Sequence, residues 1–249
     1  MMRRLFIAFV PFVFCLASCD MFSSASESTS YTPNEVGIQI IDGEQTYNKT
    51  VLLNRLTDID EYTKEGYGLE GIYDSPEGGT KYFSSDGKML RNYVEGDPTV
   101  FYTHWQSIED LTNTGTYEGP DELSYNQGYN FTPKASTTFG NAMKGNRSKN
   151  VKASISFYAT ETSSGEDWVY YISYDDSFIY GNKTAAKIVE ITGGRLVYPS
   201  ASPSQYSISK IMLSADVSAL QAKLWICRGL TTGKGKIYNI SYEWSFVSE

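Results

Sequence analysis

A strict alternation of apolar and polar side chains between residues 151 and 159 restricts the fold of this chain more than any other feature. Apolar side chains occupy every second position, at Val151, Ala153, Ile155, Phe157 and Ala159. The positions between them carry Lys152, Ser154, Ser156 and Tyr158. A period of two is the period of a β-strand with one buried and one solvated face. The segment therefore predicts a half-buried strand.

Further strand-like segments follow in the C-terminal half. They cover residues 168–174, 185–191, 195–198, 207–213, 222–227 and 238–246. In the last of them, one face is predicted to carry Tyr238, Ile240, Tyr242, Trp244 and Phe246. Several short strands, with no more than a helical turn near residues 216–222, predict a β-sandwich, which we assign to residues 121–249. The run of strands resembles, in general terms, the jelly-roll modules of bacterial carbohydrate-binding proteins.

A first ordered unit is predicted at residues 34–105. Its strands are expected at residues 36–41, 51–56, 66–73 and 99–105, with glycine-bearing turn signals at 42–43, 76–79 and 86–87. Residues 106–120 contain Thr114-Gly115-Thr116 and Glu118-Gly119-Pro120 and are assigned to a linker.

Several short motifs of this unit are spaced as in a known repeat. They are Lys64-Glu65-Gly66-Tyr67, then Gly71 and Tyr73, then Gly78-Gly79-Thr80-Lys81-Tyr82, and finally Phe101-Tyr102-Thr103-His104-Trp105. The series resembles the Listeria–Bacteroides repeat, also called the internalin B-repeat, with Leu69 and Ile72 where phenylalanine and tryptophan are usual. The resemblance implies a small β-grasp-like module of bacterial surface proteins that serves as a spacer or binding element. The predicted fold class is therefore all-β, a β-grasp-like module followed by a β-sandwich or jelly-roll domain.

The first eighteen residues have the pattern of a signal peptide. Arg3 and Arg4 precede an apolar run from Leu5 to Leu16, which is too short to span a bilayer as a helix. Leu16-Ala17-Ser18-Cys19 resembles a bacterial lipobox, which implies cleavage between Ser18 and Cys19 and lipid attachment to the Cys19 sulfur. Two or more acyl chains hold a protein stably on a membrane.

The lipobox resemblance implies a location in the bacterial cell envelope. Residues 19–33 are rich in serine and have little to bury, so they predict a flexible tether. The outer membrane or the cell surface is the favoured location. Asp20 resembles an inner-membrane retention signal of enteric bacteria, which keeps the periplasmic face of the inner membrane as an alternative.

Cysteine and charge exclude several classes of function. Cys227 is the only cysteine of the expected folded region, and its apolar surroundings predict a buried small hydrophobe rather than a nucleophile. The net charge is −8, or −10 once Arg3 and Arg4 are removed, and the sequence contains no basic block. Nucleic acid is therefore not an expected partner.

The sequence carries no motif that predicts an enzyme, a metal site or a cofactor site. The chain has one histidine, His104, which cannot by itself build a triad or a zinc site. A glycosidase needs a pair of carboxylates, and no pattern in the sequence selects two from the candidates Glu161, Glu166, Asp167, Asp175, Asp176, Glu190 and Glu243. A calcium site near Asp175-Asp176 and Gly181-Asn182 lacks the spaced oxygen ligands that calcium prefers.

Binding is the favoured function because the chain is rich in aromatic residues, including 20 tyrosines. Aromatic rings suit both protein interfaces and sugar rings. Six candidates lie in the C-terminal region: Trp168, Tyr170, Tyr171, Tyr174, Tyr180 and Tyr198. Because Tyr170 and Tyr171 point to opposite faces of a strand, we expect one of them to be exposed. The prediction is a non-enzymatic lipoprotein that binds a carbohydrate or a surface protein; the alternatives are an envelope spacer and, less favoured, a carboxylate-dependent glycoside hydrolase.

Overall fold

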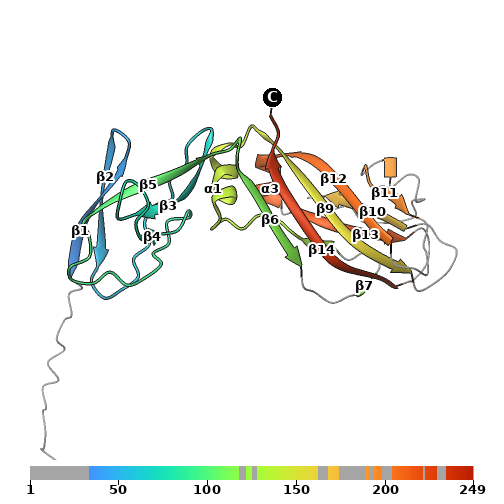
Figure 1. Ribbon diagram of the computed structural model, residues 1–249, viewed down its shortest axis with the longest axis horizontal. Coiled ribbons are helices and arrows are strands. Elements are labelled where there is room, and N and C mark those ends of the chain that lie inside the picture. The colour runs from blue at the N-terminus through green and yellow to red at the C-terminus, as the bar shows by residue number, and fades with distance from the viewer. Residues whose placement is uncertain are drawn as a thin grey trace, which may run out of the picture. The chain divides into compact units, whose positions relative to one another are not determined.

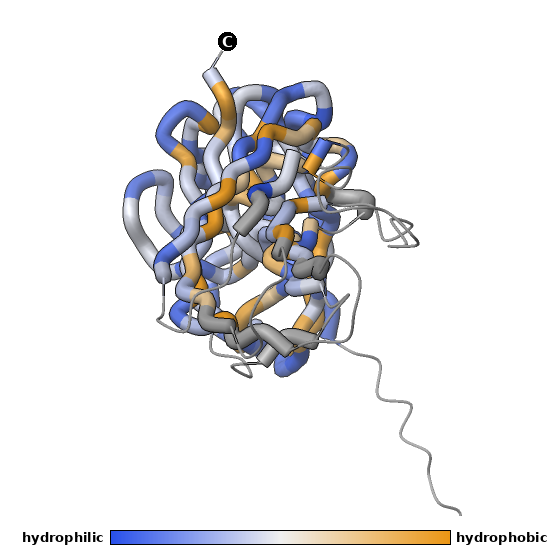
Figure 2. The backbone as a smooth tube through the Cα atoms, turned by 90° about the vertical axis from the view of Figure 1, so that its right-hand side faces the viewer, coloured by the Kyte–Doolittle hydropathy of each residue, from blue (hydrophilic) through white to orange (hydrophobic). Residues whose placement is uncertain are grey.

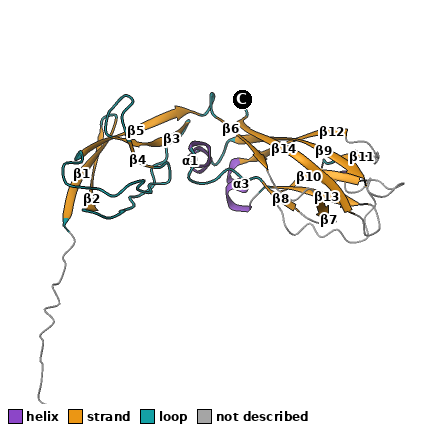
Figure 3. Cartoon of the chain, turned by 60° about the horizontal axis from the view of Figure 1, so that its bottom comes forward, coloured by secondary structure: helices purple, strands orange, loops and turns teal. Residues whose placement is uncertain are grey.

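Strands dominate the computed structural model, as the all-β prediction requires (Figure 3). The structure describes residues 34–117, 122–124, 128–161, 168–173, 189–190, 193–197, 204–220, 222–228 and 234–248. Residues 33–249 form one compact unit. The signal peptide and the tether predicted for residues 1–33 lie outside the described residues.

The first sheet is mixed and contains five strands. They are β1 (Glu35–Asp42), β2 (Gln45–Leu52), β3 (Tyr67–Tyr73), β4 (Lys81–Phe83) and β5 (Val100–Ser107). Their order is β2-β1-β5-β3-β4, and β1 and β5 are the parallel pair (Figure 1). The β1-β2 and β3-β4 hairpins lie on either side of β5, which pairs in parallel with β1, and this arrangement is compatible with the β-grasp-like module that was expected. The relation to the Listeria–Bacteroides repeat stays a prediction.

The second strand of this sheet differs from the prediction of residues 51–56. A two-residue turn, in which Gly43 has a φ of 59°, sets Gln45 directly opposite Asp42, so pairing begins there and ends at Leu52. The strand was missed because β2 is an edge strand with many polar residues. Only its inward positions, such as Tyr47 and Val51, touch the core.

A hydrophobic core lies on one face of the first sheet. The segments that follow β2 and β4 close it. The buried members are Ile38, Ile40, Val51, Leu69, Ile72, Tyr82, Phe83, Met89, Tyr93 and Phe101.

The strands of residues 112–246 form two antiparallel sheets. They are β6 (Thr112–Tyr117), β7 (Glu122–Ser124), β8 (Gly128–Asn130), β9 (Asn150–Glu161), β10 (Trp168–Ser173), β11 (Arg195–Val197), β12 (Ser204–Leu213), β13 (Lys223–Arg228) and β14 (Lys234–Phe246). One sheet has the order β6-β14-β9-β12, with β7 also pairing with β14, and the other has the order β8-β13-β10-β11.

The strands of these two sheets pair in a nested order. The first of them, β6, pairs with the last, β14, and β8, near the start, pairs with β13, the last but one. This nesting defines a jelly roll. Hydrophobic and hydrophilic stretches are interspersed along the described backbone in Figure 2. In β9 the alternation follows the prediction, because Val151, Ala153, Ile155, Phe157 and Ala159 are all buried.

Two expectations about the region between the sheets are wrong. Strand β6 lies inside residues 106–120, which were assigned to a linker, because its backbone pairs with β14. Residues 138–145 were not expected to be helical, yet they form α1 (Thr138–Gly145). The local signal was present: the Thr137 hydroxyl caps the helix by accepting a bond from the Gly140 amide at 3.1 Å. The second helix, α3 (Ser214–Leu220), lies close to the predicted helical turn.

Helix α1 joins the first sheet to the jelly roll. Phe139, Ala142 and Met143 of α1 are buried in the jelly-roll core. On the side of the first sheet, the helix lies directly on Gly68 of β3, where a Cβ atom would come within 2.6 Å of the Thr138 carbonyl oxygen. Only glycine fits this position without a shift of the backbone.

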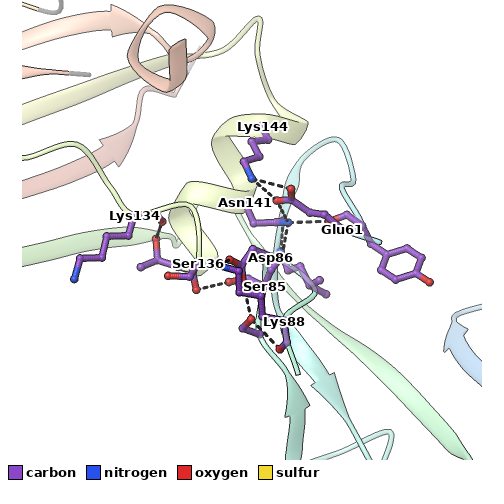
Figure 4. Close-up of polar contacts among 12 residues, drawn as sticks. Glu61, Ser85, Asp86, Lys88, Lys134, Ser136, Asn141 and Lys144 are labelled. Atoms are coloured by element: carbon purple, nitrogen blue, oxygen red, sulfur yellow. Dashed lines mark hydrogen bonds and ion pairs between the residues drawn. The ribbon is translucent and has the colours of Figure 1, made fainter. Parts of the chain in front are cut away.

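The Asn141 side chain holds this junction (Figure 4). It is fully buried, and its Oδ1 accepts a hydrogen bond from the Leu69 amide at 2.8 Å. Its Nδ2 donates to the carbonyl oxygens of Tyr62 and Ser85 at 2.8 and 2.9 Å. One side-chain amide thus forms hydrogen bonds with the backbone of β3 and with the backbone of both covering segments, the one after β2 and the one after β4. Beside it, Lys144 of α1 forms an ion pair of 2.7 Å with Glu61.

We expect Asn141→Ala to lower the free energy of unfolding by about 3 kcal/mol, because it leaves buried backbone groups without partners. Urea unfolding of soluble residues 31–249 measures this change. Asn48→Ala, on the exposed side of β2, is the control and should change the stability by less than about 0.5 kcal/mol. Equal losses in the two variants would contradict the role given to Asn141.

Candidate functional site

The two predicted binding tyrosines that the structure describes are both buried. Tyr170 is 3% exposed and Tyr171 is 1% exposed, so the expectation that one of them faces solvent is wrong. Tyr170 enters the jelly-roll core, where its ring lies 4.8 Å from that of Phe157. Tyr171 stacks on Trp225 of β13, with 6.4 Å between ring centroids. Strand β10 is therefore covered on both faces.

The side chains of the other predicted binding residues lie outside the part of the chain that the structure describes. Tyr174, Tyr180 and Tyr198 lie outside the described residues, as do the side chains of Trp168 and Cys227 and all of Cys19. Among the carboxylates, only the Glu190 and Glu243 side chains are described, and both are exposed. Within the described part of the chain, no group of three or more His, Cys, Asp or Glu residues could hold a metal ion.

The outer face of the β6-β14-β9-β12 sheet is lined with hydroxyl groups. The strand registers place its outward residues in three rows across the sheet, which we call the hydroxyl face. The rows are Thr116-Ser241-Ser156-Ser207, then Thr114-Glu243-Ser154-Ser209, then Thr112-Ser245-Lys152-Ile211. Neighbouring strands lie about 4.8 Å apart. The face therefore presents a regular lattice of donors and acceptors.

A pair of tyrosines continues the lattice in a fourth row. Tyr238 of β14 stands opposite Tyr158 of β9, and the rings stack with 5.8 Å between centroids and 17° between planes. Both side chains are partly exposed. In the next row, Ser156 and Ser207 share a hydrogen bond of 2.8 Å between their hydroxyl groups. An apolar ring surface thus lies directly beside hydroxyl groups.

The position of Tyr238 corrects the prediction that it shares a face with Ile240 and Trp244. The register between β14 and β9 shifts between Tyr238 and Ser241, and Asn239 there has a φ of 51°. This β-bulge inserts an extra residue, so Tyr238 turns outward while Ile240 stays in the core. Asparagine is one of the few residues other than glycine that readily adopts this conformation, which was the signal available in the sequence.

The charges on the hydroxyl face are balanced. Its three rows carry one carboxylate, that of Glu243, and one ammonium group, that of Lys152. The inward side of the same sheet holds Lys210, which donates to the Ile172 carbonyl at 3.1 Å and whose pKa is lowered by burial. A neutral surface of hydroxyl groups and rings fits an uncharged polar ligand better than a phosphate or a polyanion.

A second aromatic cluster lies on the outer face of the first sheet, but its polar atoms are already paired. His104 stacks on Tyr73 with 4.0 Å between ring centroids, and its Nε2 lies 2.9 Å from the Ser75 carbonyl oxygen. The Tyr73 hydroxyl donates to Glu70 at 3.1 Å. Burial and the Glu70 carboxylate together raise the pKa of Tyr73 to about 12. The described polar contacts of this cluster are therefore all local ones.

Among known proteins, no protein-family model matches the chain, and no curated protein matches it. One similar solved structure is that of Israeli acute paralysis virus heated to 63 degrees, as a full particle, with a TM-score of 0.27 and 12% identity over 77% of this chain and 94% of that chain. A crystal structure of the same virus gives a TM-score of 0.25 and 12% identity over 80% and 95% of the two chains. Similarity at this level carries no information about fold or function.

Neither of the described helices has the length and apolar character that a membrane crossing requires.

We expect Asn239→Val to lower the free energy of unfolding by about 1–2 kcal/mol, because a β-branched residue is strained at this positive φ. Asn239→Gly keeps the bulge and should stay within about 0.5 kcal/mol of the parent protein. Thermal or urea unfolding compares the two variants. Because Asn239 is exposed, an equal loss in both would point to a side-chain contact instead of the backbone.

Proposed function

We propose that this protein is a lipid-anchored component of a bacterial envelope and that it binds a carbohydrate through the hydroxyl face of its jelly roll. The observation that carries the carbohydrate proposal is the stacked pair of Tyr158 and Tyr238 beside three rows of hydroxyl groups. The proposal includes no chemical step and no cofactor.

The chemistry of sugars matches this surface. The C–H faces of a sugar ring pack on an aromatic ring, and its hydroxyl groups both donate and accept hydrogen bonds. On the hydroxyl face, Ser154 and Ser156 offer the same dual capacity, and Glu243 accepts. A regular lattice of such groups suits a polymer with repeating units, because each sugar meets similar partners. Individual contacts of this kind are weak, so affinity would come from several sugars at once.

The proposed anchor rests on the resemblance of Leu16 to Cys19 to a lipobox. The described fold begins at residue 34, which leaves fifteen residues from Cys19 onward to connect it with a lipid. In this proposal the β-grasp-like sheet is part of the displayed body, and the jelly roll carries the binding surface. We place the protein on the outer membrane or the cell surface, with the periplasmic face of the inner membrane as the alternative.

Soluble residues 31–249 should bind a subset of polysaccharides on a glycan array. We expect Tyr158→Ala and Tyr238→Ala each to weaken that binding about fivefold to tenfold, because each removes half of the stacking surface. Tyr67→Ala is the matched control, since Tyr67 is an exposed tyrosine of the first sheet, 41% accessible, and should leave binding unchanged. A folded protein that binds no glycan would favour the spacer role instead.

The anchor has a separate test in the full-length chain. We expect Cys19→Ala to move the protein from the membrane fraction to the soluble fraction of cells, because no thioether can form. Fractionation with and without detergent measures this shift, and protease treatment of intact cells reports whether the parent protein is exposed on the surface. If the variant still needs detergent for its release, Cys19 is not the anchor.

A further inference from the structure

Three large apolar side chains of the first ordered region lie exposed on its surface. Leu56 is 60% exposed, Leu90 is 54% exposed and Val94 is 39% exposed. We call these three residues the apolar patch. They come from the two segments that cover the core of the first sheet, one after β2 and one after β4.

The two segments run side by side and are held by backbone contacts. The Asn54 amide donates to the Tyr93 carbonyl at 2.7 Å, and the Ile59 amide donates to the Gly87 carbonyl at 2.9 Å. Between these bonds, the Met89 amide donates to the Asp58 carboxylate at 3.1 Å. Leu56 therefore lies on the strip of chain that neighbours the segment carrying Leu90 and Val94.

The backbone beneath the patch is fixed by the core. Met89 and Tyr93, which precede Leu90 and Val94 in sequence, are 5% and 2% exposed and pack in the core of the first sheet. The Tyr93 hydroxyl lies 3.1 Å from the Pro98 carbonyl oxygen, to which it donates. Since Met89 and Tyr93 are anchored in the core, the backbone holds the adjacent Leu90 and Val94 on the outside. Their exposure is a fixed property of the surface.

The patch lies where the chain enters the fold. The Leu53 amide donates to the carbonyl of Asn34, the first described residue, at 3.0 Å. Leu53 is also bridged to Tyr93. The fifteen residues from Cys19 to Pro33 can reach at most about 50 Å even when fully extended. A lipid at Cys19 would therefore keep this end of the fold within about 50 Å of the bilayer.

The charges around the patch favour an apolar contact over a strongly electrostatic one. The Arg91 guanidinium pairs with Asp97 at 2.9 Å, and the Lys88 ammonium lies 3.6 Å from Asp86. Each of these cations has a carboxylate beside it, so the surface does not select anionic lipids by charge. Long cationic side chains next to exposed leucines are nevertheless typical of surfaces that rest at a lipid interface.

We infer that Leu56, Leu90 and Val94 insert into the interfacial region of the same bilayer that holds the Cys19 lipid. The inference rests on the proposed lipid anchor. The anchor alone would tether a freely turning body, whereas a second contact beside the entry point of the tether fixes which side of the fold faces the lipid. Two membrane contacts also hold more stably than one.

Brominated lipids test this contact in the full-length, lipidated protein. The protein is reconstituted into phosphatidylethanolamine and phosphatidylglycerol vesicles, with or without phosphatidylcholine that is brominated along its acyl chains. Leu90→Trp is the reporter, and Leu56→Trp is a second reporter should the first fail to fold. Ile211→Trp is the control, because Ile211 is 56% exposed on the hydroxyl face of the jelly roll. The four native tryptophans give the background, measured in the parent protein.

We expect the two patch reporters to lose fluorescence in brominated vesicles and the Ile211→Trp control to lose none beyond the background. Insertion to about 5–10 Å brings an indole ring within contact of the quencher. If the protein floats with the vesicles while the patch reporters behave like the control, the anchor holds and the inferred contact is wrong. If the protein does not float with the vesicles, the anchor fails, and the inferred contact fails with it.

Discussion

The buried amide of Asn141 is the interaction on which the arrangement of the folded chain depends. A buried amide with unmet donors and acceptors is costly, so this side chain stabilises the fold only if all its partners are in place. Its backbone partners are groups of Tyr62, Leu69 and Ser85, which belong to different segments of the first sheet and its cover, and its Nδ2 also donates to the Glu61 carboxylate. The apolar side of the same helix is part of the jelly-roll core. Helix α1 therefore has a polar side that bonds to the first sheet and its covering segments, and an apolar side that packs in the jelly-roll core.

The all-β class could be predicted because the alternation of side chains is a local property that tertiary structure seldom overrides in long strands. Strand β9 shows this, since its buried positions are those of the period-two pattern. Strand β2 and helix α1 could not be found in this way. The polar edge strand β2 is defined by its turn and its partner β1, and α1 has only eight residues, of which the apolar ones face a core made by distant strands.

The binding surface was misplaced for a different physical reason. A sequence gives the face on which a residue lies but not whether that face is covered, and both faces of β10 are covered. Tyr238 shows the opposite error: it was expected on the inner face of β14, but the bulge at Asn239 places its ring on the outer face. Bulges change the register of a strand by one residue and so reverse the side on which the preceding residues lie. In the sequence, the residues of the hydroxyl face are only serines and threonines at alternate positions of separate strands. The registers between the strands place them in common rows.

The two proposed surfaces make different demands on the fold. A lattice of hydroxyl groups recognises a repeating ligand only if its rows keep their spacing, and this spacing comes from the ladders of four paired strands. The apolar patch needs only three side chains held outward by a fixed backbone. If the patch rests on the bilayer, the direction in which the hydroxyl face points is set by whatever links the first sheet to the jelly roll. Helix α1 is such a link, and its bonds to both parts are buried. The stability of that one junction would then decide whether membrane contact and ligand binding act as parts of a single oriented body.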